Sequence, residues 1–299
     1  MMEKPFVLHF ITPAKNTSPF DANMAYDSGY NAVIPYTNVQ PNEVMGLVQD
    51  AIFSRGPRGV WRTGIFIGGR DIDVAMDMLA TAKKSMVPPF EVSVFADPSG
   101  AFTTAAAMMA MVERELKRNF GGNLAGRKVS IFGATGPVAG CTAVIAAKNG
   151  ATVELVAHRA VADVQAKAEG YNKRYGTSIG YTDGSTDELK KKILQSTDVA
   201  LCAAAAGVRV ITLEQMANSP TLKVVADVNA VPPVGAEGVG VASDGEQISG
   251  TKAVGLGALA IGNVKYQVQN MLFRKMLEGQ GHVYLDFLSA FEVARRDFG

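Results

Sequence analysis

The stretch Lys-Val-Ser-Ile-Phe-Gly-Ala-Thr-Gly-Pro-Val-Ala-Gly-Cys-Thr, residues 128–142, decides how the chain folds. An apolar segment leads into a glycine-rich bend, and an apolar pattern of helical spacing follows it. This order predicts a strand, a tight turn and a helix, with backbone N–H groups and the positive end of the helix dipole at the turn. Residues 151–157 predict the next strand, which completes a βαβ unit. A turn of this kind binds the phosphates of a dinucleotide.

The small residues of this turn lie close to the spacing of the Gly-x-Gly-x-x-Gly motif. Ala134, Gly136 and Ala139 occupy its three small-residue positions, and Gly133 comes one position early. The residues predicted to contact the dinucleotide here are Gly133, Ala134, Thr135, Gly136, Pro137 and Val138. The alternative is a turn that only packs a helix against a strand, because any tight turn there favours glycine.

The end of the second strand indicates which nicotinamide cofactor binds. An NAD-selective site places Asp or Glu there, and its carboxylate accepts hydrogen bonds from the ribose 2′-OH. Here His158 and Arg159 follow the strand, and no acid does. A planar guanidinium can grip a 2′-phosphate, and the imidazole can add a donor. We therefore predict that His158 and Arg159 bind NADP, with NAD as a possible second cofactor. The alternative for Arg159 is a solvated charge.

Composition excludes several classes of function. The chain has 299 residues, 47% of them hydrophobic and 19% charged, which is enough for two domains with a substantial core. A formal net charge of +1 predicts no nucleic-acid partner and no anionic membrane partner. No apolar run approaches the roughly 20 residues that span a bilayer. Without a signal-peptide pattern at the start, we expect a cytoplasmic protein. Two cysteines and three scattered histidines predict no disulfide framework and no metal site.

Strand-like and helix-like segments alternate along the chain, which predicts an α/β protein with mostly parallel, twisted sheets. Besides the strand within residues 128–142, strands are expected at residues 6–11, 32–36, 63–67, 91–96, 151–157, 178–181, 199–203 and 223–228. Besides the helix that follows the glycine-rich bend, helices are expected at residues 22–28, 42–52, 72–84, 102–118, 161–175, 186–194, 259–277 and 285–296.

The glycine-rich residues 120–126 predict a linker between two domains. We expect an N-terminal α/β domain at residues 1–120 and a Rossmann-type NAD(P)-binding domain at residues 126–280. A C-terminal helix at residues 285–299 is expected to pack back on the first domain.

Ligands of open parallel sheets bind beyond the carboxyl ends of the strands, so we expect the active site in a cleft between the domains. Two loops at this rim add residues to the predicted cofactor site. Ala204 follows the strand at 199–203, and Asn229 follows the strand at 223–228. For Asn229 the alternative is an Asx turn before Pro232.

The sequence resembles the bacterial NAD(P)-dependent methylene-tetrahydromethanopterin dehydrogenases over essentially its whole length. The most specific stretches are residues 17–21, 32–37, 50–55, 63–69, 95–100 with Thr103-Thr104, 226–233 and 255–265. The resemblance implies two α/β domains with a cleft and a homo-oligomer, a trimer in relatives. It implies oxidation of methylene- to methenyl-tetrahydromethanopterin by hydride transfer to NADP or NAD, a step of one-carbon (formaldehyde) metabolism. Relatives can carry a full Gly-x-Gly-x-x-Gly where this chain has Ala134 and Ala139.

The implied chemistry suits the residues present. The hydride leaves a carbon between two nitrogens whose lone pairs take up the positive charge, so no proton need be abstracted. The protein must hold the donor carbon and the nicotinamide C4 about 3–3.5 Å apart. A nearby carboxylate would stabilise the developing cation. We predict Asp21 in this catalytic role and Asp97 as the second choice, in the substrate site. The alternative for Asp21 is an acid that complements a helix dipole.

Other residues of the resembling segments are expected at the pterin. Lys265 corresponds to a lysine of the relatives' active site, and its ammonium suits the pterin's polar edge or acidic tail. The alternative is an exposed helix lysine. Phe20 is expected to form an apolar wall, or else to belong to the core. Thr103 and Thr104 are expected to donate to pterin or cofactor, or else to cap their helix.

Two other functions remain open from the sequence. One is a methylene-tetrahydrofolate dehydrogenase on the same scaffold, with or without cyclohydrolase activity. We predict a dehydrogenase only, because the sequence shows no further acid/base set for hydrolysis. The other, of a different class, is a non-catalytic NADP(H)-sensing protein, which would bind the cofactor without turnover.

Overall fold

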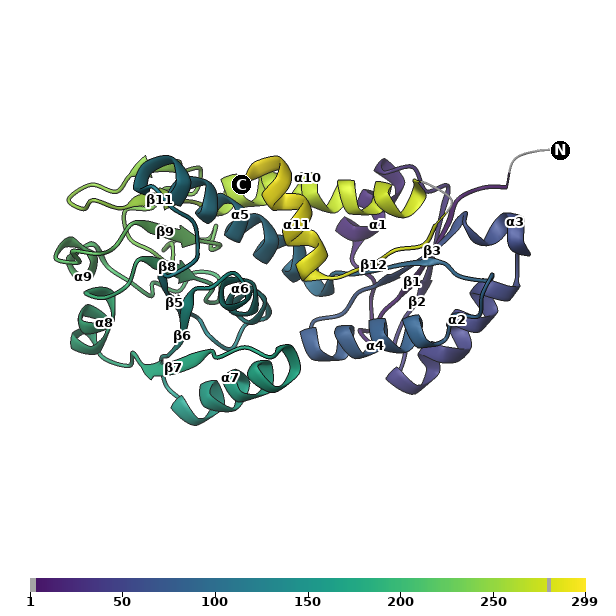
Figure 1. Cartoon of the computed structure of the whole chain (residues 1–299), viewed down its shortest axis with the longest axis horizontal. Coiled ribbons are helices and arrows are strands. Elements are labelled where there is room, and N and C mark those ends of the chain that lie inside the picture. Colours follow the sequence, from purple (N-terminus) through teal and green to yellow (C-terminus); the bar gives the residue numbers. More distant parts are fainter. Residues whose placement is uncertain (1–3, 279–280) are drawn as a thin grey trace. The chain divides into compact units, whose positions relative to one another are not determined.

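The computed structural model describes residues 4–278 and 281–299, and its chain divides into two compact units (Figure 1). The first unit comprises Met1–Thr103 and Tyr266–Val293, and the second comprises Thr104–Lys265 and Ala294–Gly299. The divisions fall inside three helices, whereas the glycine-rich residues 120–126 lie within the second unit. Helices that continue from one unit into the other give no change in composition at the boundary, so the sequence pattern does not mark it.

The first unit is built on a five-stranded sheet in which every neighbouring pair is parallel. In spatial order the strands are β12 (Tyr284–Leu285), β4 (Ser93–Ala96), β3 (Thr63–Ile67), β1 (Val7–Ile11) and β2 (Ala32–Tyr36). Every residue of β3 and β4 is buried, as expected for strands covered on both faces.

Aromatic side chains join the sheet of the first unit to a helix from near the end of the chain. Phe66 of β3 lies 5.3 Å from Phe95 of β4, measured between ring centroids. Phe273 of α10 (Ala258–Leu277) lies 5.2 Å from each of these rings. This unit also contains α1 (Pro19–Asp27), η1 (Pro41–Glu43), α2 (Val44–Phe53), α3 (Pro57–Val60), α4 (Ile72–Lys84), η2 (Pro98–Gly100) and most of α11 (Phe287–Phe298).

The second unit contains a seven-stranded sheet with a reversal in strand order. In spatial order it runs β10 (Asp244–Gln247), β11 (Val254–Leu256), β9 (Val224–Asp227), β8 (Val199–Cys202), β5 (Lys128–Phe132), β6 (Thr152–Ala157) and β7 (Gly180–Asp183). Only the pair of β10 and β11 is antiparallel. The chain goes from β5 to β6 and β7 on one side, then resumes at β8 on the other side. This order confirms the expected Rossmann-type fold, with a switch point between β5 and β8.

Helices cover both faces of the second sheet. Figure 1 shows α6 (Pro137–Lys148) on one side of it and α8 (Asp187–Leu194) with α9 (Leu213–Ala217) on the other. Ile193 and Leu194 of α8 share a buried cluster with Phe132, Val156 and Cys202 of the strands. The second unit also contains α7 (Val161–Tyr175) and most of α5 (Ala101–Phe120).

The expected strands and helices are present, with differences where the segments are short. The helix expected from residue 285 begins later, because residues 284–285 pair with β4 as a strand. Asp286 then caps α11 (Phe287–Phe298) by accepting the backbone N–H groups of Leu288 and Ser289, both at 3.0 Å. The elements α3, α9, β10, β11 and β12, none longer than five residues, carry too little periodicity to be predicted.

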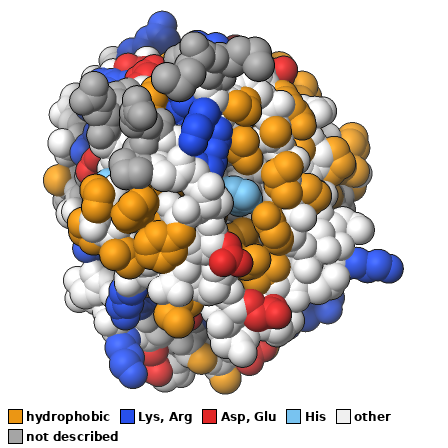
Figure 2. Space-filling model, turned by 90° about the vertical axis from the view of Figure 1, so that its right-hand side faces the viewer, with side chains coloured by type: hydrophobic (Ala, Val, Ile, Leu, Met, Phe, Trp, Pro, Cys, Tyr) orange, Lys and Arg blue, Asp and Glu red, His pale blue; other side chains and the backbone are white. Residues whose placement is uncertain are grey.

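The surface of the first unit carries apolar side chains, as Figure 2 shows. Large hydrophobic side chains exposed in this unit include Tyr26, Ile34, Met45, Phe53, Trp61 and Val87. Ile34 lies in β2, at one edge of the sheet. In the part of the chain that the structure describes, no helix combines the length and apolarity needed to cross a membrane.

A buried ion pair fixes the last turn of α11 within the second unit. The carboxylate of Glu113 is fully buried and accepts hydrogen bonds from Nε and Nη2 of Arg295, both at 2.5 Å. In Arg295→Ala, Lys117 at 3.7 Å would be left beside this carboxylate. We expect the free energy of unfolding, measured by urea denaturation, to fall by about 2 kcal/mol, because a buried carboxylate loses its main partner.

Arg296→Ala provides the matched control for this prediction. Arg296 is 70% exposed and pairs with its neighbour Asp297 at 2.7 Å. Loss of an exposed pair should cost less than about 0.5 kcal/mol. Equal losses in the two variants would contradict a structural role for the Glu113 pair.

Candidate functional site

The turn after β5 requires glycine at its first position. Gly133 has a φ of +80°, which L side chains rarely adopt. A Cβ atom there would lie 2.4 Å from the backbone nitrogen of Ala204 and 2.5 Å from the carbonyl carbon of Ala203. The turn after β5 therefore lies directly against the loop after β8, at the switch point of the sheet.

The helix after this turn begins without a capping side chain. Gly136 is the N-cap of α6, Pro137 occupies its first turn, and no side chain of the described chain caps it. The Gly136 N–H donates to the Gly133 carbonyl at 3.2 Å. Ala134 is buried and Thr135 is exposed, while Val138 is half-buried. The first N–H groups of α6 and the positive end of its dipole are thus arranged as in an anion site.

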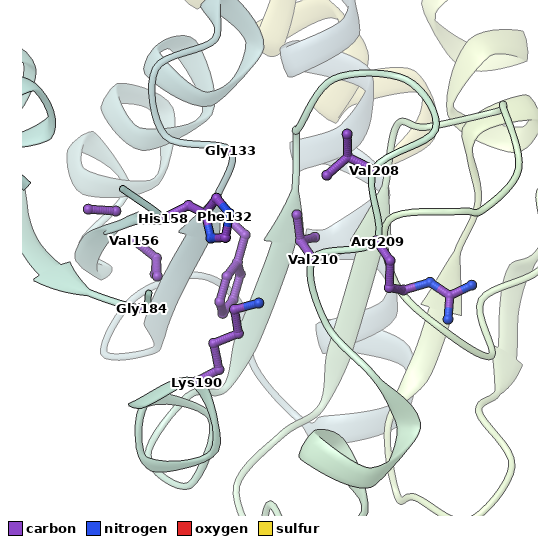
Figure 3. Close-up of a pocket in the computed structure, with 10 residues that line it drawn as sticks. Phe132, Gly133, Val156, His158, Gly184, Lys190, Val208, Arg209 and Val210 are labelled. Carbon is purple, nitrogen blue, oxygen red and sulfur yellow. The ribbon is translucent and has the colours of Figure 1, made fainter. Parts of the chain in front are cut away.

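A pocket of about 320 Å³, partly open to solvent, lies beside this turn at the carboxyl ends of β5 and β6 (Figure 3). Its lining residues are Phe132, Gly133, Val156, Ala157, His158, Gly184, Lys190, Val208, Arg209 and Val210. The walls are apolar, three side chains are basic, and the lining contains no carboxylate.

The basic side chains around this pocket differ in their partners. Arg209 donates from Nε to the Val234 carbonyl at 2.7 Å and pairs with Glu237 at 3.2 Å. Figure 3 shows the Arg209 guanidinium directed away from Phe132, and the Lys190 side chain running beside the Phe132 ring. His158 is exposed at the end of β6. Arg209 therefore stabilises a neighbouring loop, whereas His158 and Lys190 are directed to the pocket.

The loop after β9 is held by Asp227 and Asn229. Asp227 is buried and accepts the backbone N–H groups of Asn229 at 2.9 Å and Ala236 at 3.0 Å. Burial raises the pKa of Asp227, although these N–H groups act in the opposite direction. The Asn229 side chain accepts from Val231 at 2.9 Å and Gly207 at 3.2 Å. The bond to Val231 is the Asx turn considered from the sequence, and the bond to Gly207 ties two rim loops together.

In the first unit Asp21 is a buried acid near the start of α1. Ser18 caps this helix by accepting the Asp21 N–H at 3.2 Å. The Asp21 carboxylate accepts a hydrogen bond from Nε2 of Gln269 at 2.7 Å and is 3% exposed. Gln269 belongs to α10, so the side chain of Asp21 is oriented by a residue 248 positions later in the chain.

Asp97 and Thr103 form a hydrogen-bonded group at the start of α5. The Asp97 carboxylate is fully buried and accepts the N–H groups of Phe102 at 2.9 Å and Thr103 at 3.2 Å. The Thr103 hydroxyl donates to the same carboxylate at 2.6 Å. Asp97 therefore caps the helix, and Thr103 completes the cap, as the capping alternative for Thr103 proposed.

Phe20 is exposed rather than part of the core. Its ring lies 6.4 Å from that of Tyr266 in an edge-to-face contact, and both side chains are nearly half exposed. Lys265 lies in α10 and is half-buried, and Thr104 is half-buried in α5. An exposed aromatic pair of this kind is a ready contact surface for a flat ring.

Comparisons with known proteins identify the family. Residues 19–99 match the family model described as methylene-tetrahydromethanopterin dehydrogenase, N-terminal. The chain is 48% identical to an NAD(P)-dependent methylenetetrahydromethanopterin dehydrogenase of Methylorubrum extorquens, over 96% of this chain and 97% of the relative. The chain belongs to the methylene-tetrahydromethanopterin dehydrogenase family.

Two further proteins widen the comparison for this dehydrogenase family member. The bifunctional protein MdtA of Methylorubrum extorquens is 31% identical over 95% of this chain and 96% of its own length. The crystal structure of a shikimate 5-dehydrogenase from Listeria monocytogenes matches with a TM-score of 0.51 at 15% identity, covering 92% of this chain and 95% of that one. The structural match bears on the fold alone.

Several site features of this dehydrogenase family member were not predicted from its sequence. They are Phe132, Gly184, Lys190, Val208, Arg209 and Val210 at the pocket, and Tyr266 and Gln269 in the first unit. One signal was available for Lys190. It lies three and four residues before Ile193 and Leu194, so helical spacing places it on the buried face of α8. Lys191 and Lys192 follow it directly, so the sequence pattern alone does not distinguish Lys190 from its neighbours.

Gly133→Ala tests the contact at the switch point. The added Cβ meets the backbone of Ala203 and Ala204, which cannot rotate away, and the φ of +80° adds strain. We expect the free energy of unfolding to fall by about 2 kcal/mol or more, together with loss of dinucleotide binding, measured by thermal denaturation and by calorimetry with NADP.

Gly170→Ala is the control in the same unit. Gly170 lies within α7, and nothing lies within 4 Å of a Cβ added there. This substitution should leave NADP binding unchanged and raise stability by about 0.5 kcal/mol. If Gly133→Ala behaved like Gly170→Ala, the close approach at the turn would be refuted.

Proposed function

We propose that this protein oxidises methylene-tetrahydromethanopterin to methenyl-tetrahydromethanopterin by direct hydride transfer to NADP, with NAD as a second cofactor. The observation that carries the proposal is the glycine turn at the switch point, beside a pocket with basic side chains and no carboxylate. Membership of the family and the name of the 48% identical relative support the substrate and the reaction. The proposed step belongs to one-carbon metabolism.

The cofactor is proposed to bind the second unit. The pyrophosphate would lie over residues 133–138, where the N–H groups at the start of α6 face an anion. The adenosine would occupy the apolar pocket, with His158 and Arg159 at its 2′-phosphate. Ala204 would contact the dinucleotide through its backbone beside Gly133. Asn229 would contribute to cofactor binding by holding together the two rim loops that it joins.

The pterin is proposed to contact side chains of α1 and α10. Phe20, with its partner Tyr266, would give the apolar wall for the ring system. Asp97 and Thr103, which bind one another, would shape this site as one group. Thr104 follows them in α5 as a proposed polar contact.

The reaction requires little covalent chemistry from the protein itself. The C–H bond of the methylene carbon breaks as its hydride passes to C4 of the nicotinamide, and the adjacent nitrogen lone pairs form the amidinium cation. Asp21, held by Gln269, would stabilise this cation as a carboxylate. Lys265, one helical turn before Gln269 in α10, would contact the pterin's polar edge, where a positive charge does not oppose the cation.

One assay tests the activity and separates the alternatives. The purified protein is mixed with methylene-tetrahydromethanopterin and NADP, and formation of NADPH is followed by absorbance. We expect turnover with this carrier and little with methylene-tetrahydrofolate. Turnover with the folate alone would replace the methanopterin assignment. Cofactor binding without turnover on either carrier would favour the NADP(H)-sensing protein.

Asp21→Asn tests the proposed carboxylate. The amide keeps the size of the side chain but removes the charge that would face the cation, so kcat should fall by about tenfold to a hundredfold with little change in the KM for NADP. Asp27→Asn, an exposed position of the same helix, should leave kcat unchanged. A change in melting temperature alone would leave Asp21 as a structural acid at the helix start.

Arg159→Ala tests the proposed cofactor preference. Loss of a guanidinium at the 2′-phosphate should raise the KM for NADP by about tenfold and leave the KM for NAD nearly unchanged. Lys173→Ala removes an exposed cation from α7 and should change neither constant. Equal effects of Arg159→Ala on both cofactors would count against 2′-phosphate recognition.

We also propose a cytoplasmic homo-oligomer, a trimer as the family resemblance implies, with small-molecule ligands and neither nucleic acid nor membrane as partner. The exposed apolar side chains of the first unit, Ile34 on edge strand β2 among them, support self-association. The near-neutral net charge of +1 supports the absence of a nucleic-acid partner.

A further inference from the structure

We propose that Lys190 of α8 is a specificity-determining residue, whose ammonium binds the 2′-phosphate of NADP from inside the pocket while His158 and Arg159 approach from the end of β6. This inference rests on the proposed cofactor site. It adds Lys190 to the proposed 2′-phosphate site. Lys190 comes 31 positions after Arg159 in the sequence, and its helix α8 lies on the opposite face of the sheet from α6.

The helix directs Lys190, alone among the three consecutive lysines of α8, to the pocket. Ile193 and Leu194 are buried against the sheet, and Lys190 lies one turn before them on the same face. Lys191 pairs instead with Glu214 of α9 at 2.6 Å. Lys192 is exposed. The three side chains therefore have three different environments, although the sequence presents them as one run.

The side chain of Lys190 forms part of the pocket wall. Lys190 lines it together with Phe132 and His158, and Figure 3 shows its side chain extended beside the Phe132 ring. The positive charge of Lys190 also acts on Cys202, at the end of β8. There the pKa of the buried Cys202 thiol is raised by burial and by Asp227, while Lys190 acts to lower it. Because Lys190 and His158 both line the pocket, an anion bound there can contact both side chains.

Lys190 has no counter-charge in the part of the chain that the structure describes. The nearby acids are engaged elsewhere: Asp187 accepts from Gln215 at 2.9 Å, and Glu214 pairs with Lys191. Arg209, the other strong cation of the lining, is already matched by Glu237. An ammonium that faces an apolar pocket without a carboxylate in its lining can form charge-assisted hydrogen bonds to an anion bound there.

A phosphate explains this arrangement better than an adenine ring does. The 2′-phosphate carries close to two negative charges and three acceptor oxygens, so it is stabilised by several cations at once. An adenine ring edge offers single neutral acceptors, which do not require a cluster of cations. Lys190 is accordingly assigned to the phosphate that distinguishes NADP from NAD.

The experiment compares two fragments that differ only in this phosphate. Binding of 2′,5′-ADP and of 5′-AMP to the full chain is measured by isothermal titration calorimetry. For Lys190→Gln we expect binding of 2′,5′-ADP to weaken by about tenfold or more and binding of 5′-AMP to change by less than about twofold. Lys190→Arg should retain most of the affinity for 2′,5′-ADP. Circular dichroism verifies that each variant is folded.

Lys192→Gln is the matched control, since it removes the same charge from an exposed position of the same helix. It should leave both affinities unchanged. Equal weakening of both fragments by Lys190→Gln would overturn the proposal in favour of an adenine contact. Equal effects of Lys190→Gln and Lys192→Gln, no effect of either, or no binding of 2′,5′-ADP by the unaltered protein would also overturn it.

The outcome is separable from the proposed activity. If the unaltered protein failed to turn over the pterin, yet Lys190→Gln selectively lost 2′,5′-ADP, the activity would be refuted and the inference would stand. If turnover with NADP occurred and Lys190→Gln kept its affinity for 2′,5′-ADP, only the inference would fail.

Discussion

The close approach of Gly133 to the backbone of Ala203 and Ala204 is the constraint on which the second unit depends. A doubly wound sheet opens a crevice where two adjacent strands send their chains in opposite directions. Here the backbone of Ala203 and Ala204 lies so close to Gly133 that only glycine, which has no Cβ, fits at this position. That contact brings the uncapped start of α6, the pocket and the loop tied by Asn229 to the same edge of the sheet.

Acidic and basic residues are used differently in the two units. The candidate acids of the first unit, Asp21 and Asp97, are buried and held by hydrogen bonds to an amide, a hydroxyl and backbone N–H groups. Asp97 acts as a helix cap, which suits it to shaping a site more than to reacting in it. Asp21 accepts a hydrogen bond from Gln269 on another helix, and a fixed carboxylate needs little reorganisation when charge develops nearby. In the second unit, His158, Lys190 and Arg209 instead line a pocket whose lining contains no carboxylate.

The sequence was sufficient for the features that depend on local pattern. The strand–turn–helix at residues 128–148, the Rossmann-type order and the boundaries of elements such as β3 and α4 follow from hydrophobic periodicity and glycine placement. It was insufficient where a role depends on distant residues. Gln269 and Tyr266 meet Asp21 and Phe20 only after more than 240 residues of intervening chain. Lys190 is one of three consecutive lysines, so the sequence does not single it out. The unit boundaries could not be predicted because helices run through them.

The first unit is assembled from both ends of the chain. Its sheet ends in β12, and its aromatic core includes Phe273, so residues that complete it are synthesised after the seven strands of the second unit. During synthesis, β1 to β4 precede α10 and β12 by the length of the second sheet, so the part of their apolar surface that Phe273 and β12 contact stays uncovered for that time. Contacts of such long sequence separation slow folding and expose intermediates to aggregation. A chain that lacked the residues from 284 onward would therefore lose β12 from the sheet that is built mainly by the amino-terminal residues.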